Sequence, residues 1–239
     1  NCTAVDIAYT PADLCRLKKA GKKAVMLGIE NGYAIGKDIT NVERFRHRGV
    51  VYMTLCHNGN NDICGSARYN EEELGVSTFG EQVIKEMNRV GMMVDVSHAG
   101  EKSFYDALAI SGKPIVASHS SARALCDHPR NLTDDQLKAL ADKGGVAQVC
   151  MYGGFLRKNG EATIKDAIEH LNHMVNVMGI EHVGIGTDFD GDGGITGCAS
   201  ASELINFTRR LLLERYSGES IRLIWGGNFL RVMEEVQRK

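Results

Sequence analysis

Two histidines, a glutamate and an aspartate each close a short apolar run of this sequence. Glu30 ends AVMLGIE, His98 ends MMVDVSH, His119 ends PIVASH and Asp188 ends HVGIGTD. Imidazole nitrogens and carboxylate oxygens are ligands of zinc and related metals, and one glutamate can bridge two ions. Two metals about 3.5–4 Å apart can polarise a carbonyl and activate a hydroxide together. We therefore predict a metal site formed by Glu30, His98 and His119.

Asp188 is expected to have a catalytic role, because a carboxylate beside a metal site can accept a proton and pass it to a leaving amine. The alternative is an N-cap for the following segment. The stretch from Asp188 to Gly193 also imitates the start of a calcium-binding EF-hand loop. Its twelfth position is Ala199 instead of Glu, and a strand is expected before it, so calcium binding is rejected.

Two further residues are weaker candidates for contacts with a substrate. His57, in CHNGNND, could hydrogen-bond a developing oxyanion. Arg130, in DHPRN, could hold a carboxylate through two parallel hydrogen bonds, although a solvated arginine is the ordinary case. The other histidines do not follow an apolar run and are interpreted as surface or helix residues: His47, His128, His170, His173 and His182.

The apolar runs are rich in Val, Ile and Met, and they predict buried parallel strands because their hydrophobicity is nearly continuous. Between them lie amphipathic segments with helix caps and glycine stops. The expected strands are 24–30, 50–57, 92–98, 114–119, 145–150 and 182–188. The expected helices are 11–20, 78–90, 133–143, 164–178, 202–216 and 228–237.

Alternating strands and helices predict an α/β fold, either an open doubly wound sheet or a TIM-type (β/α)8 barrel. Polar residues at the ends of several different strands favour the barrel, since an open sheet concentrates its chemistry at one switch point. Only six of eight strands are recognised. We therefore expect a single domain over residues 1–239 whose first two βα units are missing from this chain.

Composition sets limits on partners and on cysteine chemistry. The chain of 239 residues is 43% hydrophobic with a net charge of −2, so no attraction to nucleic acid is expected. No apolar run approaches the roughly 18 residues that span a bilayer. The seven cysteines include no CxxC pair, which favours reduced, mostly buried thiols over a disulfide framework.

Six blocks of the sequence resemble the membrane (renal) dipeptidase family, peptidase family M19. The similarity runs in chain order from about residue 20 to the final GGNFLRVMEEV. Several blocks are six or more residues long, which is far more specific than a single motif. The blocks are GIENGYAIG, YMTLCHN, VDVSHAG, ASHSSAR, HPRN and GIGTDFDG.

The resemblance implies a TIM-barrel dipeptidase with two zinc ions, which attacks the peptide bond of dipeptides with a metal-bridging hydroxide. Some members accept a C-terminal D-residue or open β-lactams, and many are dimers. By this resemblance Glu30 bridges the ions, and His98 and His119 bind one of them. Asp188 transfers the proton. The resemblance also implies that His57 contacts the substrate or tetrahedral intermediate and that Arg130 binds the substrate's C-terminal carboxylate.

One departure from the family pattern concerns the second zinc ion. The family has a His-x-Asp pair on its first strand, and this chain contains none. Because all downstream site residues are present, we expect a missing N-terminal segment in preference to a degenerate homologue. Hydrolysis of a cyclic amide or lactam, and a non-catalytic barrel homologue, remain alternatives. The compartment (cytoplasmic, or periplasmic or secreted in a bacterium) and a homodimer are left open.

Overall fold

The computed structural model describes residues 3–69 and 73–238, and its contacts divide the chain into two compact units. The first unit consists of the residues up to Ile115 and those from Leu230 onward, and the second unit is Val116–Phe229. The single domain over residues 1–239 stays a prediction, since compactness within each unit does not decide whether the units fold together. No helix formed by the described residues has both the length and the apolar character needed to cross a bilayer.

The strands of the first unit are all parallel to their neighbours. One pair is β1 with β2, and β3, β4 and β5 pair in chain order. The register places Glu30, Thr54 and Asp95 side by side at the carboxyl ends of the last three strands. This edge is therefore the one that presents polar side chains. The bounds are β1 (Val5–Ile7), β2 (Lys23–Val25), β3 (Leu27–Glu30), β4 (Val50–Thr54) and β5 (Met93–Asp95).

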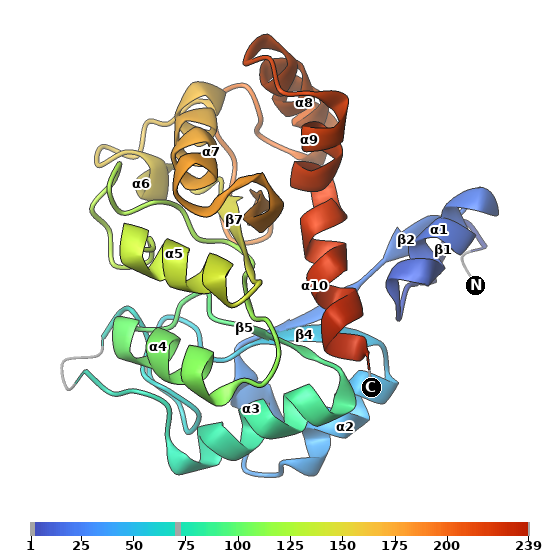
Figure 1. Ribbon diagram of the computed structural model, residues 1–239, viewed down its shortest axis with the longest axis vertical. Coiled ribbons are helices and arrows are strands. Elements are labelled where there is room, and N and C mark those ends of the chain that lie inside the picture. Colours follow the sequence, from blue (N-terminus) through green and yellow to red (C-terminus); the bar gives the residue numbers. More distant parts are fainter. Residues whose placement is uncertain (1–2, 70–72, 239) are drawn as a thin grey trace. The chain divides into compact units, whose positions relative to one another are not determined.

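Helices of the first unit connect these strands, and three of them, α2, α3 and α4, follow one another in contact (Figure 1). The start of α3 is fixed by Ser77, whose hydroxyl accepts a hydrogen bond from the backbone N–H of Gly80. Gly91 ends α3 in the left-handed region at φ 75°. The bounds are α1 (Pro11–Lys19), the 3-10 helix η1 (Gly32–Ile35), α2 (Thr40–His47), α3 (Thr78–Val90) and α4 (Glu101–Ile110).

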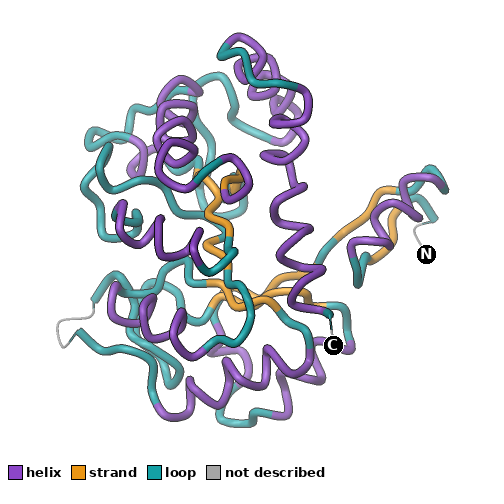
Figure 2. The backbone as a smooth tube through the Cα atoms, viewed as in Figure 1, coloured by secondary structure: helices purple, strands orange, loops and turns teal. Residues whose placement is uncertain are grey.

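The second unit repeats the parallel pattern with β6 (Val116–Ala117), β7 (Val146–Cys150) and β8 (Val183–Gly186). Helices α5 and α7 pack against β7, as Figure 2 shows. Cys150 is paired with Gly186, so the ends of β7 and β8 are level. The helices are α5 (Asp134–Asp142), α6 (Gly153–Leu156), α7 (Ile164–Met178), α8 (Leu204–Leu213), α9 (Gly218–Arg222) and α10 (Asn228–Gln237), of which α10 continues into the first unit.

Four of the six predicted strands are too long at their carboxyl ends, and those ending at Glu30 and Cys150 end as predicted. Glu30 is the last residue of β3, as expected, but β5 ends at Asp95, three residues before His98. His98 adopts φ 67° and Asp188 adopts φ 58°, a left-handed backbone that cannot continue a strand. His57, His119 and Asp188 likewise follow β4, β6 and β8 on loops. The predicted strand 24–30 is also interrupted, with β2 and β3 on either side of Met26.

The parallel α/β architecture predicted from the sequence is confirmed in both units. Helices α3, α7 and α10 have the predicted bounds. The predicted helix 202–216 is a short 3-10 turn, Ala201–Glu203, followed by α8. Strand β1 and helices α2, α4, α6 and α9 were not predicted. Closure into eight strands and the two missing βα units stay predictions.

Candidate functional site

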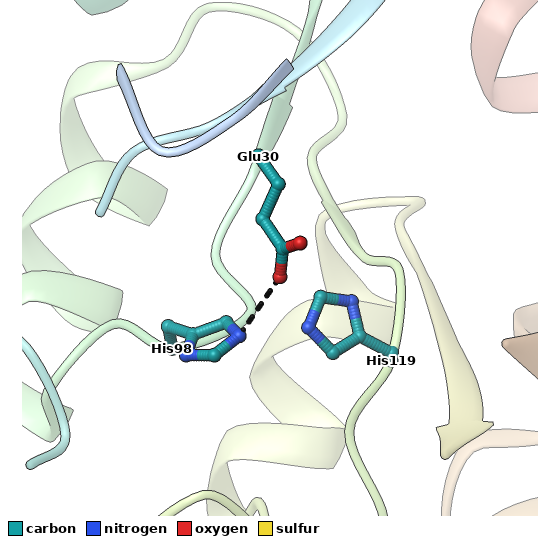
Figure 3. A group of neighbouring side chains, drawn as sticks. All are labelled: Glu30, His98 and His119. Atoms are coloured by element: carbon teal, nitrogen blue, oxygen red, sulfur yellow. Dashed lines mark hydrogen bonds and ion pairs between the residues drawn. The ribbon is translucent and has the colours of Figure 1, made fainter. Parts of the chain in front are cut away.

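A carboxylate and an imidazole meet at the edge of the first unit. Oε1 of Glu30, at the end of β3, lies 3.0 Å from Nε2 of His98, which follows β5 (Figure 3). The Glu30 side chain is 40% exposed and that of His98 only 7%. The His98 ring is thus held in place by burial. The Glu30 carboxylate faces solvent, where it can also bind a ligand.

His57 is the third member of this group. Its Nε2 lies 3.7 Å from the same Glu30 oxygen, and its ring centroid lies 4.3 Å from that of His98, tilted by 34°. With 42% of its side chain exposed, His57 is accessible to a bound molecule. The first unit therefore brings together three of the predicted site residues from three different strand ends.

Ser66 holds the two histidine loops to each other, and the sequence analysis missed it. Its buried hydroxyl lies 2.6 Å from the carbonyl oxygen of His57 and 3.4 Å from that of His98. The backbone N–H of Ala67 donates to the His98 carbonyl at 2.7 Å. These contacts fix the left-handed backbone of His98. No sequence pattern predicts them, because Ser66 lies in a loop without periodicity.

Asp95 is a second residue that the sequence analysis missed. It is fully buried at the end of β5 and accepts hydrogen bonds from the Thr54 hydroxyl at 2.6 Å and from the Ser97 N–H at 3.0 Å. Asp95 therefore ties the end of β4 to the turn that leads to His98. A signal was present in the sequence, since a carboxylate inside an apolar run needs buried partners.

His119 and Arg130 lie together in the second unit. The Ser118 hydroxyl lies 2.8 Å from Nδ1 of His119, whose ring is buried. If Nδ1 donates to this hydroxyl, Nε2 has the lone pair that a metal requires. The guanidinium of Arg130, also buried, lies 3.5 Å from the His119 carbonyl oxygen and 5.3 Å from the ring centroid of Phe155. Arg130 is thus not the solvated arginine of the ordinary case.

Asp188 is placed by the glycine-rich loop that follows it. The N–H groups of Gly191 and Gly193 donate to its carbonyl oxygen at 3.0 and 2.7 Å. Its Oδ2 lies 3.5 Å from the sulfur of Cys150 at the end of β7. The carboxylate is half-buried at the carboxyl ends of β7 and β8. The next helical turn begins only at Ala201, and the catalytic role of Asp188 stays a prediction.

The donor set of the first unit fits a metal ion. Glu30 and His98 present a carboxylate oxygen and an imidazole nitrogen 3.0 Å apart. Zinc takes these ligand types. Without an ion, the same atoms form the hydrogen bond that Figure 3 shows. Glu30 and His98 could therefore hold a metal with little rearrangement.

The described cysteines are free thiols, and His170 is a buried histidine outside the candidate site. Five of the described cysteines are free and buried and Cys15 is free and exposed, which confirms the expected thiols; Cys2 lies outside the described residues. His170 lies in a helix, as predicted, but is buried there: its Nδ1 accepts the Ala122 N–H at 3.1 Å, and Nε2 lies 3.2 Å from the Leu156 carbonyl oxygen.

The family model described as membrane dipeptidase (peptidase family M19) matches residues 1–239. An uncharacterized dipeptidase of Schizosaccharomyces pombe is 38% identical over 232 residues, which cover 94% of this chain and 56% of that protein. The chain thus spans about half the length of the curated relatives it matches.

Solved structures share the fold over nearly the whole chain. A probable dipeptidase, PvdM of Pseudomonas aeruginosa, has a TM-score of 0.93 at 31% identity, covering 98% of this chain and 74% of that one. A metallopeptidase of Rhodobacter sphaeroides has a TM-score of 0.90 at 26% identity, covering 98% and 69% of the two chains. The latter structure contains a phosphinate mimic of the dipeptide L-Ala-D-Ala.

Proposed function

Because this chain belongs to the membrane dipeptidase family, peptidase family M19, we propose that the full-length protein is a zinc-dependent dipeptidase. The observation that supports this most directly is the Glu30–His98 pair, a carboxylate and a buried imidazole 3.0 Å apart at two strand ends. The family membership supplies the reaction class, and the pair supplies donors that a metallopeptidase needs.

We propose Glu30, His98 and His119 as metal ligands, since each offers a donor atom of a type that zinc binds (Figure 3). Glu30 would bridge two ions. When bound, zinc would polarise the peptide carbonyl and supply a hydroxide at neutral pH. The protein's own contribution is to fix the ligands: Ser66 holds the His98 loop, and Ser118 orients the His119 ring.

Three other side chains would bind the substrate or transfer the proton. Asp188 would accept the proton of the attacking water and deliver it to the amine that leaves. His57, exposed beside Glu30, would hydrogen-bond the oxygen that becomes negative. Arg130 would pair with the C-terminal carboxylate of the substrate, since a guanidinium forms two parallel bonds to a carboxylate.

A C-terminal D-residue is the finer part of the proposal. It is supported by the Rhodobacter sphaeroides relative, whose structure was solved with a mimic of L-Ala-D-Ala. We therefore expect the zinc-loaded full-length enzyme to hydrolyse both an L-L and an L-D dipeptide in steady-state assays. Turnover of a lactam but of neither dipeptide would contradict the proposal and favour the cyclic-amide alternative. A homodimer is proposed too, and light scattering on the same preparation measures its mass.

The role of Asp188 separates catalysis from simple binding. Asp188→Asn should lower turnover by about 10²–10⁴, the range of general acid–base catalysis, and leave the zinc content unchanged. Asp190→Asn, in the same loop but with an exposed side chain, is the matched control and should retain parental turnover. Full activity in Asp188→Asn would show that the proton-transfer role is wrong. A protein that binds no zinc and turns over neither dipeptide would be a non-catalytic homologue.

A further inference from the structure

Cys150 ends β7, and Asp188 lies on the loop that follows the neighbouring strand β8. Cys150 is the last residue of β7 and pairs with Gly186, the last residue of β8; Asp188 follows two residues later. The Cys150 sulfur lies 3.5 Å from Oδ2 of Asp188, which is a normal distance for a hydrogen bond from a thiol. The fold therefore brings a thiol donor to this carboxylate.

The Cys150 thiol can donate a hydrogen bond but is not a reactive thiol. Burial raises the pKa of Cys150 far above its ordinary value, and the neighbouring negative charge of Asp188 raises it further. The side chain is fully buried. A buried thiol in such surroundings stays protonated, so Cys150 is neither a nucleophile nor a redox centre. What remains is its S–H group, directed at a carboxylate oxygen.

The following loop passes close to the other carboxylate oxygen at Gly191. A Cβ on Gly191 would lie 2.6 Å from Oδ1 of Asp188 and 3.5 Å from Oδ2. The N–H of Gly191 also donates to the Asp188 carbonyl. The terminal torsion of an aspartate is broad, so its carboxylate can turn unless neighbours fix it. Here the loop passes close to one oxygen at Gly191, and the Cys150 thiol donates to the other.

We propose that Cys150 is a positioning residue, which holds the Asp188 carboxylate in the orientation needed for proton transfer. This inference rests on the proposed dipeptidase function and extends it to a residue outside the proposed metal ligands and substrate-binding residues. A thiol is a weak hydrogen-bond donor, and the bond is strengthened here because its acceptor is a carboxylate. Small errors in the placement of a catalytic group reduce turnover strongly. Loss of the thiol should therefore slow the chemical step.

Two substitutions in the full-length, zinc-loaded enzyme test this role. Cys150→Ala should lower kcat about tenfold, the scale of one such bond, with KM and zinc content unchanged. Cys150→Ser keeps a donor and should restore most of kcat. Cys126→Ala is the matched control, because Cys126 is also buried in the second unit but donates to the Gly154 carbonyl. It should keep parental kinetics.

Full kcat in Cys150→Ala would overturn the proposal, as would a serine variant no faster than the alanine variant. A second measurement does not depend on activity. The infrared S–H stretching band of Cys150 is isolated as the difference between the parent and Cys150→Ala. Replacing the carboxylate by a neutral amide, in Asp188→Asn, weakens the acceptor, so the band should move to higher frequency.

The two measurements distinguish the failure of each proposal. An unmoved S–H band would overturn the positioning role even in an active dipeptidase. A band that moves in a protein without dipeptide turnover would support the hydrogen bond and contradict the dipeptidase function. A moved band together with the loss in kcat and its rescue by serine would support both.

Discussion

The hydroxyl of Thr54 donates a 2.6 Å hydrogen bond to Oδ2 of Asp95, and both side chains are fully buried. Thr54→Val keeps the shape of the side chain and removes the donor. A hydrogen bond to a buried charged group contributes about 1.5–3 kcal/mol. We expect Thr54→Val to lower the free energy of unfolding of the full-length protein by this amount, measured by urea denaturation.

An exposed hydrogen bond of the same length is the control for Thr54→Val. The hydroxyl of Thr40 donates to Oδ1 of Asp38 at 2.6 Å, where both residues are exposed to water. Thr40→Val should change the free energy of unfolding by no more than about 0.5 kcal/mol. If both substitutions lowered the free energy of unfolding equally, burial would not explain the contribution of the Thr54 hydroxyl to stability.

His98→Ala should lower the zinc content of the full-length protein. The ring is 7% exposed and its Nε2 lies beside the Glu30 carboxylate, so its removal deletes a nitrogen ligand without changing the surface. Zinc is measured by elemental analysis after dialysis against limiting metal. The control is His47→Ala, whose ring is exposed on α2, and it should keep parental zinc. Equal zinc in the two variants would remove His98 from the ligand set.

Helix positions and residue types at the site could be predicted from the sequence, because both depend on local patterns. The bounds of α3 and α7 follow from apolar residues at helical spacing. The capping threonine Thr163 and the left-handed Gly91 mark ends that the sequence shows directly. Strand ends were harder, since the turn at His98 depends on a hydrogen bond from Ala67, in a distant loop.

Contacts between strands could not be predicted in the same way. Cys150 was expected to be a buried thiol, and it is. Its acceptor, Asp188, lies 38 residues later, and the contact exists only because β7 and β8 pair in one particular register. Ser66 bridges two loops for a similar reason. Such interactions depend on tertiary structure, and local sequence patterns do not predict them.

Gly191→Ala should displace the Asp188 carboxylate. The added methyl group would lie 2.6 Å from Oδ1, too close for an ordinary contact, so the carboxylate must turn. We expect kcat to fall about tenfold to a hundredfold, as misplacement of a catalytic group does, with zinc content unchanged. Gly218→Ala is the control, because a methyl there meets nothing within 4 Å. Parental kcat in Gly191→Ala would show that the orientation of Asp188 is not critical.

His170 should make stability depend on pH. Burial lowers its pKa below the ordinary value of 6.5, with a smaller opposing effect from the hydrogen bond to Leu156. As pH falls below about 6.5, the unfolded chain binds a proton at His170 that the folded protein does not. The free energy of unfolding is therefore highest above that pH and decreases as pH falls toward the lowered pKa.

His170→Asn tests this dependence, because an amide oxygen can still accept the Ala122 N–H but cannot titrate in this range. The variant should be less stable at neutral pH, since the contact with the Leu156 carbonyl is lost. Its stability should nevertheless fall less than that of the parent between about pH 7 and pH 5. Urea denaturation at both pH values measures the difference. Parallel decreases in the two proteins would show that protonation of His170 does not oppose folding.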